Sequence, residues 1–179
     1  APDMPVFTFN GLSKSHIVCG FRCGWLAISG ARRQIGGLIA SITKLAAMRL
    51  CGNALTQLVI PAALADEQST KDLISPGGRI YEQREATTKA LDQIEGITYV
   101  KNSAAFYIFP KIDTKKFNIT NDRKFVLDLL ENKHILLVAG SGFDWPEPDH
   151  FRIVMLPEPK VLSYAMQELG DFLSTYRQE

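Results

Sequence analysis

Residues 10–25 of the chain read NGLSKSHIVCGFRCGW, and this segment is the most informative about architecture and chemistry. Lys14 follows an apolar run at residues 6–9, and Arg22 stands between Gly20 and Gly24. Runs of apolar and β-favouring residues at 6–10 and 24–29 predict two short buried strands on either side of a loop. The segment therefore predicts a loop that carries an amine and a guanidinium close to each other.

These two cations suit one particular kind of chemistry. A lysine amine forms imines readily when it is partly desolvated and lies among other cations. An arginine flanked by glycines suits a phosphate, which favours forked donors and close backbone approach. An amine beside a phosphate anchor is what a pyridoxal phosphate site needs. Two plainer explanations exist, since Lys14 can be a solvated surface residue and Arg22 can simply tie down a turn.

The segment closely resembles the cofactor-lysine motif of class I aminotransferases, which follows the pattern S-K-x-x-x-x-x-G-x-R-x-G-[WY]. The resemblance implies that Lys14 is the catalytic residue and binds pyridoxal 5'-phosphate as an imine. It also implies that Arg22 holds the phosphate with help from Ser13. One position departs from the family, because many class I enzymes have serine where this chain has Gly11. Phosphate contacts are therefore expected from Arg22, Ser13 and groups that precede residue 1.

A second arginine, Arg152, lies in the strand-like segment HFRIVML at residues 150–156. Strand alternation directs it away from its apolar neighbours. A lone arginine in an apolar strand needs an anionic partner, because deprotonation cannot remove its charge. A structural salt bridge, for example with Glu131 or Glu168, would supply one. The segment also resembles the F-R-I-x motif of aminotransferases, which implies that Arg152 grips the substrate α-carboxylate bidentately.

A third segment, MRLCGNALTQ at residues 48–57, follows a predicted helix. In class I aminotransferases the matching segment lies at the dimer interface and approaches the cofactor of the partner subunit. The resemblance therefore implies a homodimer in which Asn53 contributes to substrate binding. The alternative is a plain turn between two helices.

Three further segments resemble the bacterial alanine aminotransferase branch of the family: RIYEQR at 79–84, AFYIFPKID at 105–113 and FDWPEPDH at 143–150. The implied reaction moves an amino group between alanine and 2-oxoglutarate, giving pyruvate and glutamate. The ligands would then be amino acids and 2-oxo acids. Two alternatives stay open: another fold type I enzyme, such as an aspartate-type aminotransferase or a lyase, or a non-catalytic interaction domain.

The resemblance implies an α/β fold, the C-terminal part of a fold type I aminotransferase. Residues 1–68 would form the end of the large cofactor-binding domain, and residues 69–179 a small α/β domain. The chain does not begin with methionine. The family's acidic partner for the pyridine nitrogen, its stacking ring and its glycine-rich phosphate loop all lie upstream of the lysine. The chain is therefore expected to be a C-terminal fragment that is inactive alone.

Composition excludes several classes of function. With 179 residues, 46% apolar and 22% charged, the chain has the make-up of an ordinary soluble globular protein. A net charge of +1 gives no indication of the strongly basic surface that binds nucleic acid or an anionic membrane. No apolar run is long enough to span a bilayer. Three cysteines argue against a disulfide framework and favour the cytoplasm, and no metal is expected because they form no tight C-x-x-C pair.

Hydrophobic periodicity predicts the remaining elements. Expected helices cover residues 31–50, 55–66 with a kink at Pro61, 69–75, 79–94, 122–133 and 159–177. Expected strands cover residues 97–100, 105–110, 135–138 and 150–156.

Overall fold

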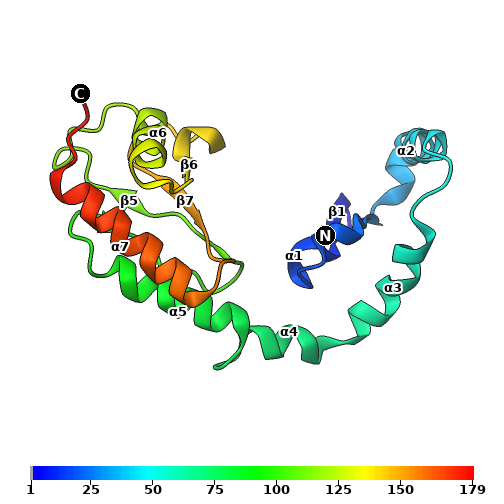
Figure 1. Ribbon diagram of the computed structural model, residues 1–179. Helices are drawn as coiled ribbons and strands as arrows, with labels where there is room; N and C mark the ends of the chain where they lie inside the picture. The colour runs from blue at the N-terminus through cyan, green and yellow to red at the C-terminus, as the bar shows by residue number, and fades with distance from the viewer. Residues whose placement is uncertain (1) are drawn as a thin grey trace. The chain divides into compact units, whose positions relative to one another are not determined.

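A computed structural model describes residues 2–179, which form two compact units (Figure 1). The first unit ends at Asp72 and the second comprises Leu73–Glu179, so the division falls within α4 (Glu67–Ile74). Each unit combines helices with antiparallel strands, which confirms a mixed α/β chain. The predicted domain boundary between residues 68 and 69 concerns the complete protein and stays a prediction.

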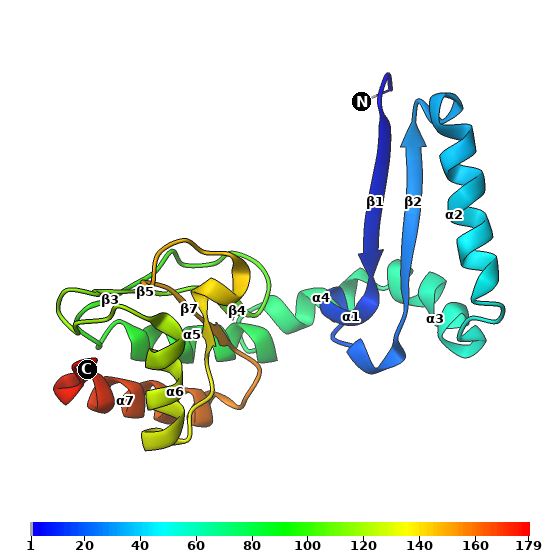
Figure 2. The ribbon, with the colours of Figure 1, turned by 90° about the horizontal axis from the view of Figure 1, so that it is seen from above.

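The first unit is built on a β-hairpin (Figure 2). Strands β1 (Pro5–Gly11) and β2 (Gly24–Gly30) pair antiparallel over their whole length, from Pro5 opposite Gly30 to Gly11 opposite Gly24. Both predicted strands are therefore confirmed, but the prediction that they are buried is wrong, because every residue of β1 and β2 is half-buried or exposed. Their connection carries the short helix α1 (Leu12–Ser15) and the 3-10 turn η1 (Cys19–Phe21).

Two glycines allow the strands to approach closely where the loop begins. A Cβ atom at Gly11 would lie 2.8 Å from the carbonyl oxygen of Cys23, and one at Gly24 would lie 3.0 Å from that of Asn10. A side chain at Gly11 would require the backbone to move, and one at Gly24 would make an unusually tight contact. The close strand contact therefore disfavours any side chain at position 11.

Helices complete the first unit. The 3-10 turn η2 (Arg32–Ile35) precedes α2 (Gly36–Met48), so the α-helix predicted from residue 31 begins five residues later. A tighter 3-10 turn is a common start to an α-helix. Helix α3 (Ala54–Ala65) contains Pro61, as predicted, whereas the predicted kink stays a prediction, and α4 follows.

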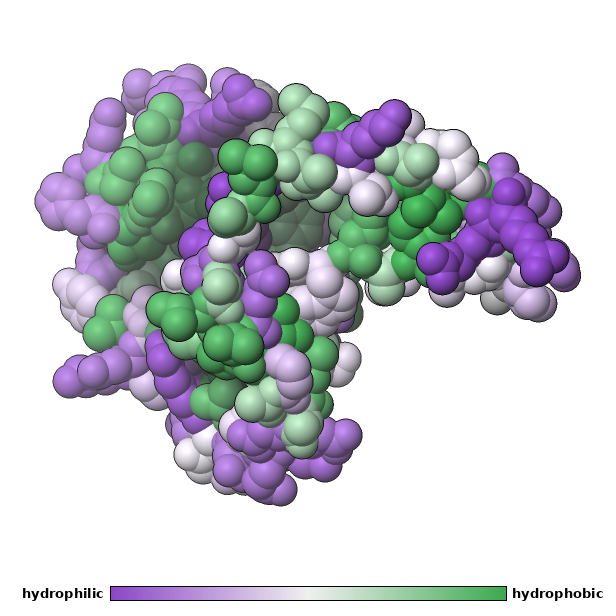
Figure 3. Space-filling model, turned by 90° about the vertical axis from the view of Figure 1, so that its right-hand side faces the viewer, coloured by the Kyte–Doolittle hydropathy of each residue, from purple (hydrophilic) through white to green (hydrophobic). Residues whose placement is uncertain are grey.

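The first unit has almost no hydrophobic core of its own. Among residues 2–72, Leu12 is the single apolar side chain in the fully buried set, and α2 has no buried residue. Large apolar side chains instead lie at the surface, and Figure 3 shows several hydrophobic patches on the face that it draws. The exposed large apolar residues of the first unit are Met4, Phe9, Phe21, Leu38, Leu45, Met48, Leu50, Leu55, Leu58, Val59 and Leu64. The first unit therefore leaves most of its large apolar side chains exposed.

The second unit begins with α5 (Arg79–Leu91), which ends short of the predicted Ile94. Strands β3 (Ile97–Thr98) and β5 (Lys111–Ile112) pair antiparallel. A second antiparallel sheet has the order β4-β7-β6, formed by β4 (Tyr107–Ile108), β7 (Phe151–Val154) and β6 (Val138–Ala139). The strand predicted over 135–138 is therefore wrong except for Val138, because the chain pairs only from that residue on.

Two helices and a turn complete this unit. Helix α6 (Asp122–Lys133) has the predicted bounds, and α7 (Pro159–Thr175) packs against both α5 and α6. Between β6 and β7 lies the 3-10 turn η3 (Gly140–Phe143). The core is contiguous and includes Phe117, Phe125, Leu129, Phe151, Met155, Met166 and Leu169. This unit therefore has the buried apolar surface that the first unit lacks.

Candidate active site

The hairpin loop places three predicted site residues together in the first unit. Ser13 and Lys14 lie on α1, and Arg22 directly follows η1, against which α1 packs. Leu12, completely buried, anchors α1 to the unit. Lys14 and Arg22 are exposed and Ser13 is half-buried, so all three side chains are accessible to a ligand.

The loop backbone is held in an unusual conformation. Ile17 and Arg22 both have positive φ, 57° and 53°, in the left-handed region that β-branched residues such as isoleucine rarely occupy. The guanidinium of Arg22 closes its own turn, since Nη1 donates a hydrogen bond of 2.7 Å to the carbonyl oxygen of Cys19. An arginine has five N–H donors, so the others can still bind an anion such as phosphate.

Helix α3 braces both ends of this loop. Thr56 Oγ1 and Asn53 Nδ2 both donate to the carbonyl oxygen of Phe21, at 3.0 and 3.3 Å. His16 Nε2 lies 2.8 Å from the carbonyl oxygen of Ala63. These bonds fix the backbone on either side of the segment between Lys14 and Arg22. Sequence reasoning missed the bracing by Thr56 and His16, because hydrogen-bond partners 35 and 47 residues away leave no local pattern.

The side chain of Asn53 has a structural function in this unit. Besides its bond to Phe21, its Oδ1 accepts a hydrogen bond of 3.3 Å from the backbone N–H of Thr56 and so caps the N-terminus of α3. The predicted contacts of Asn53 with substrate and with a partner's cofactor stay predictions.

Arg152 lies in the second unit, on the middle strand β7 of the larger sheet. Its guanidinium carbon lies 4.8 Å from the ring centroid of Tyr107 and 4.6 Å from that of Phe143, so two aromatic rings contact it. The side chain is half-buried, and its Nε is buried without a hydrogen-bond partner. Cation–π contacts at these distances stabilise a charge that cannot be neutralised.

The salt bridge considered for Arg152 does not form. Glu168 is paired with Lys133, at 2.6 Å, and Glu131 is exposed on α6. Within residues 2–179, no ion pair involves the guanidinium of Arg152. Arg152 is therefore a half-buried cation in contact with aromatic rings, with donors for an external anion such as a carboxylate.

A compact polar and aromatic cluster lies next to Arg152 in sequence. Asp149, almost fully buried, accepts hydrogen bonds from Trp145 Nε1 at 2.9 Å and His150 Nδ1 at 2.6 Å, and it pairs with Lys111 at 3.0 Å. Burial raises the pKa of Asp149, but hydrogen bonds from these three partners outweigh burial and lower its pKa to about 2. The His150 ring stacks on Phe109, at 4.9 Å between centroids. His150 is thus held by a hydrogen bond to Asp149 and by stacking on Phe109.

Comparison with known proteins places this geometry in a family. The family model described as aminotransferase class I and II matches residues 1–169, and the chain belongs to that family. Members of this family depend on pyridoxal phosphate. The amine, guanidinium and hydroxyl of the hairpin loop fit the aldehyde and phosphate of that cofactor.

Two curated relatives show where in the family the chain lies. It is 51% identical over 178 residues to the glutamate-pyruvate aminotransferase AlaA of Haemophilus influenzae, covering 99% of this chain and 44% of that protein. It is 47% identical to the alanine aminotransferase of Mycobacterium tuberculosis, covering 99% of this chain and 42% of the relative. The chain therefore spans less than half the length of these relatives.

Solved structures agree with the computed one. An aminotransferase from Escherichia coli has a TM-score of 0.96 at 46% identity, covering all of this chain and 44% of that structure. An alanine aminotransferase from Pyrococcus furiosus has a TM-score of 0.87 at 36% identity, and the match covers 97% of this chain and 43% of the Pyrococcus chain. Among residues 2–179, no helix is long and apolar enough to cross a membrane.

Proposed function

We propose that this chain is the C-terminal part of a pyridoxal phosphate-dependent alanine aminotransferase, which converts alanine and 2-oxoglutarate to pyruvate and glutamate. Support comes from family membership and from relatives whose names specify glutamate–pyruvate and alanine transamination. In the complete protein, residues 1–68 would belong to the large cofactor-binding domain and residues 69–179 would form the small domain. The complete enzyme is proposed to be a homodimer, with Asn53 near substrate.

The hairpin loop supplies the groups that would hold the cofactor. When bound, pyridoxal phosphate provides an aldehyde carbon and a ring that accepts electrons from the substrate. Lys14 Nζ would hold the cofactor at that carbon, and its amine would take a proton from the substrate Cα and return it as general base and acid. Arg22, with Ser13, binds the phosphate through N–H and hydroxyl donors.

Arg152 is the residue whose environment best supports an amino-acid substrate. Its guanidinium is half-buried against two aromatic rings, and no carboxylate among residues 2–179 pairs with it, so its N–H groups can bind an external anion. Its planar fork matches the two oxygens of an α-carboxylate and would orient the substrate for proton transfer at Cα.

The 179-residue chain by itself is proposed to be inactive. A unit with one fully buried apolar side chain cannot offset the entropy lost on folding, so the lysine loop needs protein beyond this chain for a stable pocket. Incubating the chain with pyridoxal phosphate, reducing with borohydride and mapping the modified peptides tests this. Label scattered over the eleven lysines is expected, whereas near-normal turnover of alanine and 2-oxoglutarate by this chain would contradict it.

The assignment of roles is tested in the complete enzyme. Lys14→Ala should abolish transamination and borohydride labelling of the cofactor lysine. Arg152→Lys keeps the charge but loses the fork, and should lower kcat/KM for alanine roughly 10- to 100-fold. Unchanged kcat/KM for Arg152→Lys would show that another residue binds the substrate carboxylate.

A further inference from the structure

We propose that Tyr107 and Phe143 are positioning residues for Arg152: their rings hold the guanidinium in one plane and keep its N–H edge available to the substrate carboxylate. This inference rests on the proposed function and names two residues that fix the orientation of its carboxylate site.

The first ring comes from the neighbouring strand. Tyr107 on β4 is paired with Val154 on β7. Arg152 lies two residues before Val154 on β7 and is therefore the diagonal neighbour of Tyr107. Diagonal neighbours in an antiparallel pair lie within reach of long and aromatic side chains. Phe151 and Ile153 are buried, whereas Arg152 and Val154 are half-buried, which is the alternation of a strand with one core face. The sheet register therefore sets the contact between Tyr107 and Arg152.

The second ring comes from a turn that is fastened at several points. Phe143 ends η3, whose Gly140 N–H donates to the carbonyl oxygen of His150 at 2.8 Å. Ser141 donates to both carboxylate oxygens of the buried Asp122 on α6, from its backbone N–H at 2.7 Å and its hydroxyl at 2.9 Å. A Cβ at Gly140 would lie 2.8 Å from the His150 carbonyl oxygen, so the turn sits directly against β7. The backbone that carries Phe143 is therefore fixed relative to Arg152.

Further aromatic contacts support the ring of Phe143. It meets the ring of Phe109 edge to face, at 6.1 Å between centroids, and Phe109 in turn contacts Trp145 at 5.6 Å and His150 at 4.9 Å. Hydrogen bonds to Asp149 hold Trp145 and His150. Phe143 nevertheless remains 47% exposed. A large apolar ring that stays so exposed, while touching a guanidinium, indicates a function beyond filling the core.

Rings are suited to this task because of where a guanidinium carries its donors. All five N–H groups point outward in the plane, whereas cation–π contacts use the faces. A carboxylate partner within the protein would occupy the same N–H groups that a substrate needs. Aromatic rings instead stabilise the charge and restrict rotation of the plane without consuming a donor, so the site is organised before substrate binds.

The test uses the complete enzyme and propionate, an analogue of alanine without the amino group. Binding is measured from the change in cofactor absorbance during titration. Phe143→Leu and Tyr107→Leu remove a ring but keep an apolar side chain, and each should weaken propionate binding roughly five- to tenfold. Tyr107→Phe and Phe143→Tyr keep the ring and should bind as the unchanged enzyme does. Tyr164→Leu replaces an exposed aromatic residue of α7 in the same way and serves as the matched control.

A second ligand separates positioning from general damage. Ethylamine has an amine but no carboxylate, so its reaction with the cofactor should be unchanged in both leucine variants. Equal loss for propionate and ethylamine, or unchanged propionate binding in both leucine variants, would overturn the proposal. If one leucine variant does not fold, the other gives the same comparison. Unchanged propionate binding in Arg152→Ala would instead refute the carboxylate site itself, and with it this part of the proposed function.

Discussion

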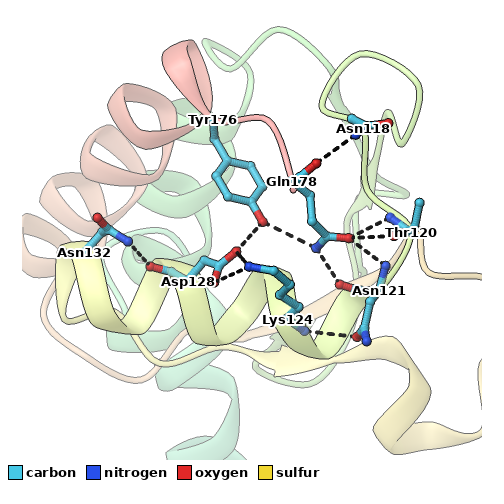
Figure 4. A network of polar contacts seen from close by, with 8 residues as sticks. All are labelled: Asn118, Thr120, Asn121, Lys124, Asp128, Asn132, Tyr176 and Gln178. Carbon is cyan, nitrogen blue, oxygen red and sulfur yellow. Dashed lines mark hydrogen bonds and ion pairs between the residues drawn. The ribbon is translucent and has the colours of Figure 1, made fainter.

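Replacing Gln178 by alanine should release the C-terminal tail of the second unit. The side chain is 3% exposed and closes a polar network over the start of α6 (Figure 4). Its Oε1 accepts hydrogen bonds from the backbone N–H groups of Thr120 and Asn121, at 2.8 and 2.9 Å, and from the Thr120 hydroxyl at 3.1 Å. Its Nε2 donates to the carbonyl oxygen of Asn121 at 2.8 Å and to the Tyr176 hydroxyl at 3.4 Å.

The expected loss follows from the four shorter bonds, which link Gln178 to Thr120 and Asn121. A typical hydrogen bond contributes about 1 kcal/mol net, so four would sum to about 4 kcal/mol. Thr120 and Asn121 are exposed, however, and water can replace part of what is lost. We therefore expect Gln178→Ala to lower the free energy of unfolding of the second unit by about 2–3 kcal/mol. The neighbouring bond from the Tyr176 hydroxyl to Asp128, at 2.7 Å, should persist.

Amide hydrogen exchange and urea unfolding of the 179-residue chain measure the effect. Exchange at Thr120 and Asn121 should speed up by roughly 30- to 150-fold, if the amides exchange through the same opening that the free energy describes. Gln167→Ala is the matched control, because Gln167 is exposed on α7, and it should change stability by less than about 0.5 kcal/mol. Equal protection of both amides in Gln178→Ala and the unchanged chain would refute this account of the network.

Three further predictions concern single positions. Ala105 has a φ of 61°, so Ala105→Gly should relieve strain and raise the free energy of unfolding by about 0.5–1 kcal/mol in urea titrations; a loss would contradict this. Gly11→Ser places Cβ 2.8 Å from the Cys23 carbonyl oxygen, and should cost about 1–3 kcal/mol and reduce the cofactor content of the complete enzyme, whereas full cofactor content would refute it. The lowered pKa of Asp149, about 2 against its usual 3.8, means that its contribution to stability is complete above about pH 4 and is lost as pH falls toward 2; Asp149→Asn should flatten acid unfolding in that range, and an unchanged acid profile would argue against it.

Part of the candidate site was predictable because its signals are local. The spacing from Lys14 to Arg22 and the segment around Arg152 are read from neighbours in the chain, and strand alternation predicts that Arg152 faces away from Phe151. Helix α6 was predicted with its observed bounds, since Asn121 caps it and its apolar residues recur at helical spacing.

Contacts between distant segments were decided by the tertiary structure. From the sequence, Glu168 was a possible partner for Arg152, but in the folded unit Glu168 forms its ion pair with Lys133. No pattern near residue 143 predicts that its ring contacts Arg152, because the contact depends on how η3 is fastened to β7.

The sequence by itself thus determined the family, most of the elements and the candidate site residues. Each of these depends on side chains within a few positions of one another, where the geometry of a helix or strand is known in advance. Three features are seen only in the tertiary structure: the close strand contact at Gly11, the bracing of the lysine loop by α3, and the aromatic rings around Arg152. These depend on register and packing between segments tens of residues apart, which hydrophobic burial and hydrogen bonding select only when the whole unit folds.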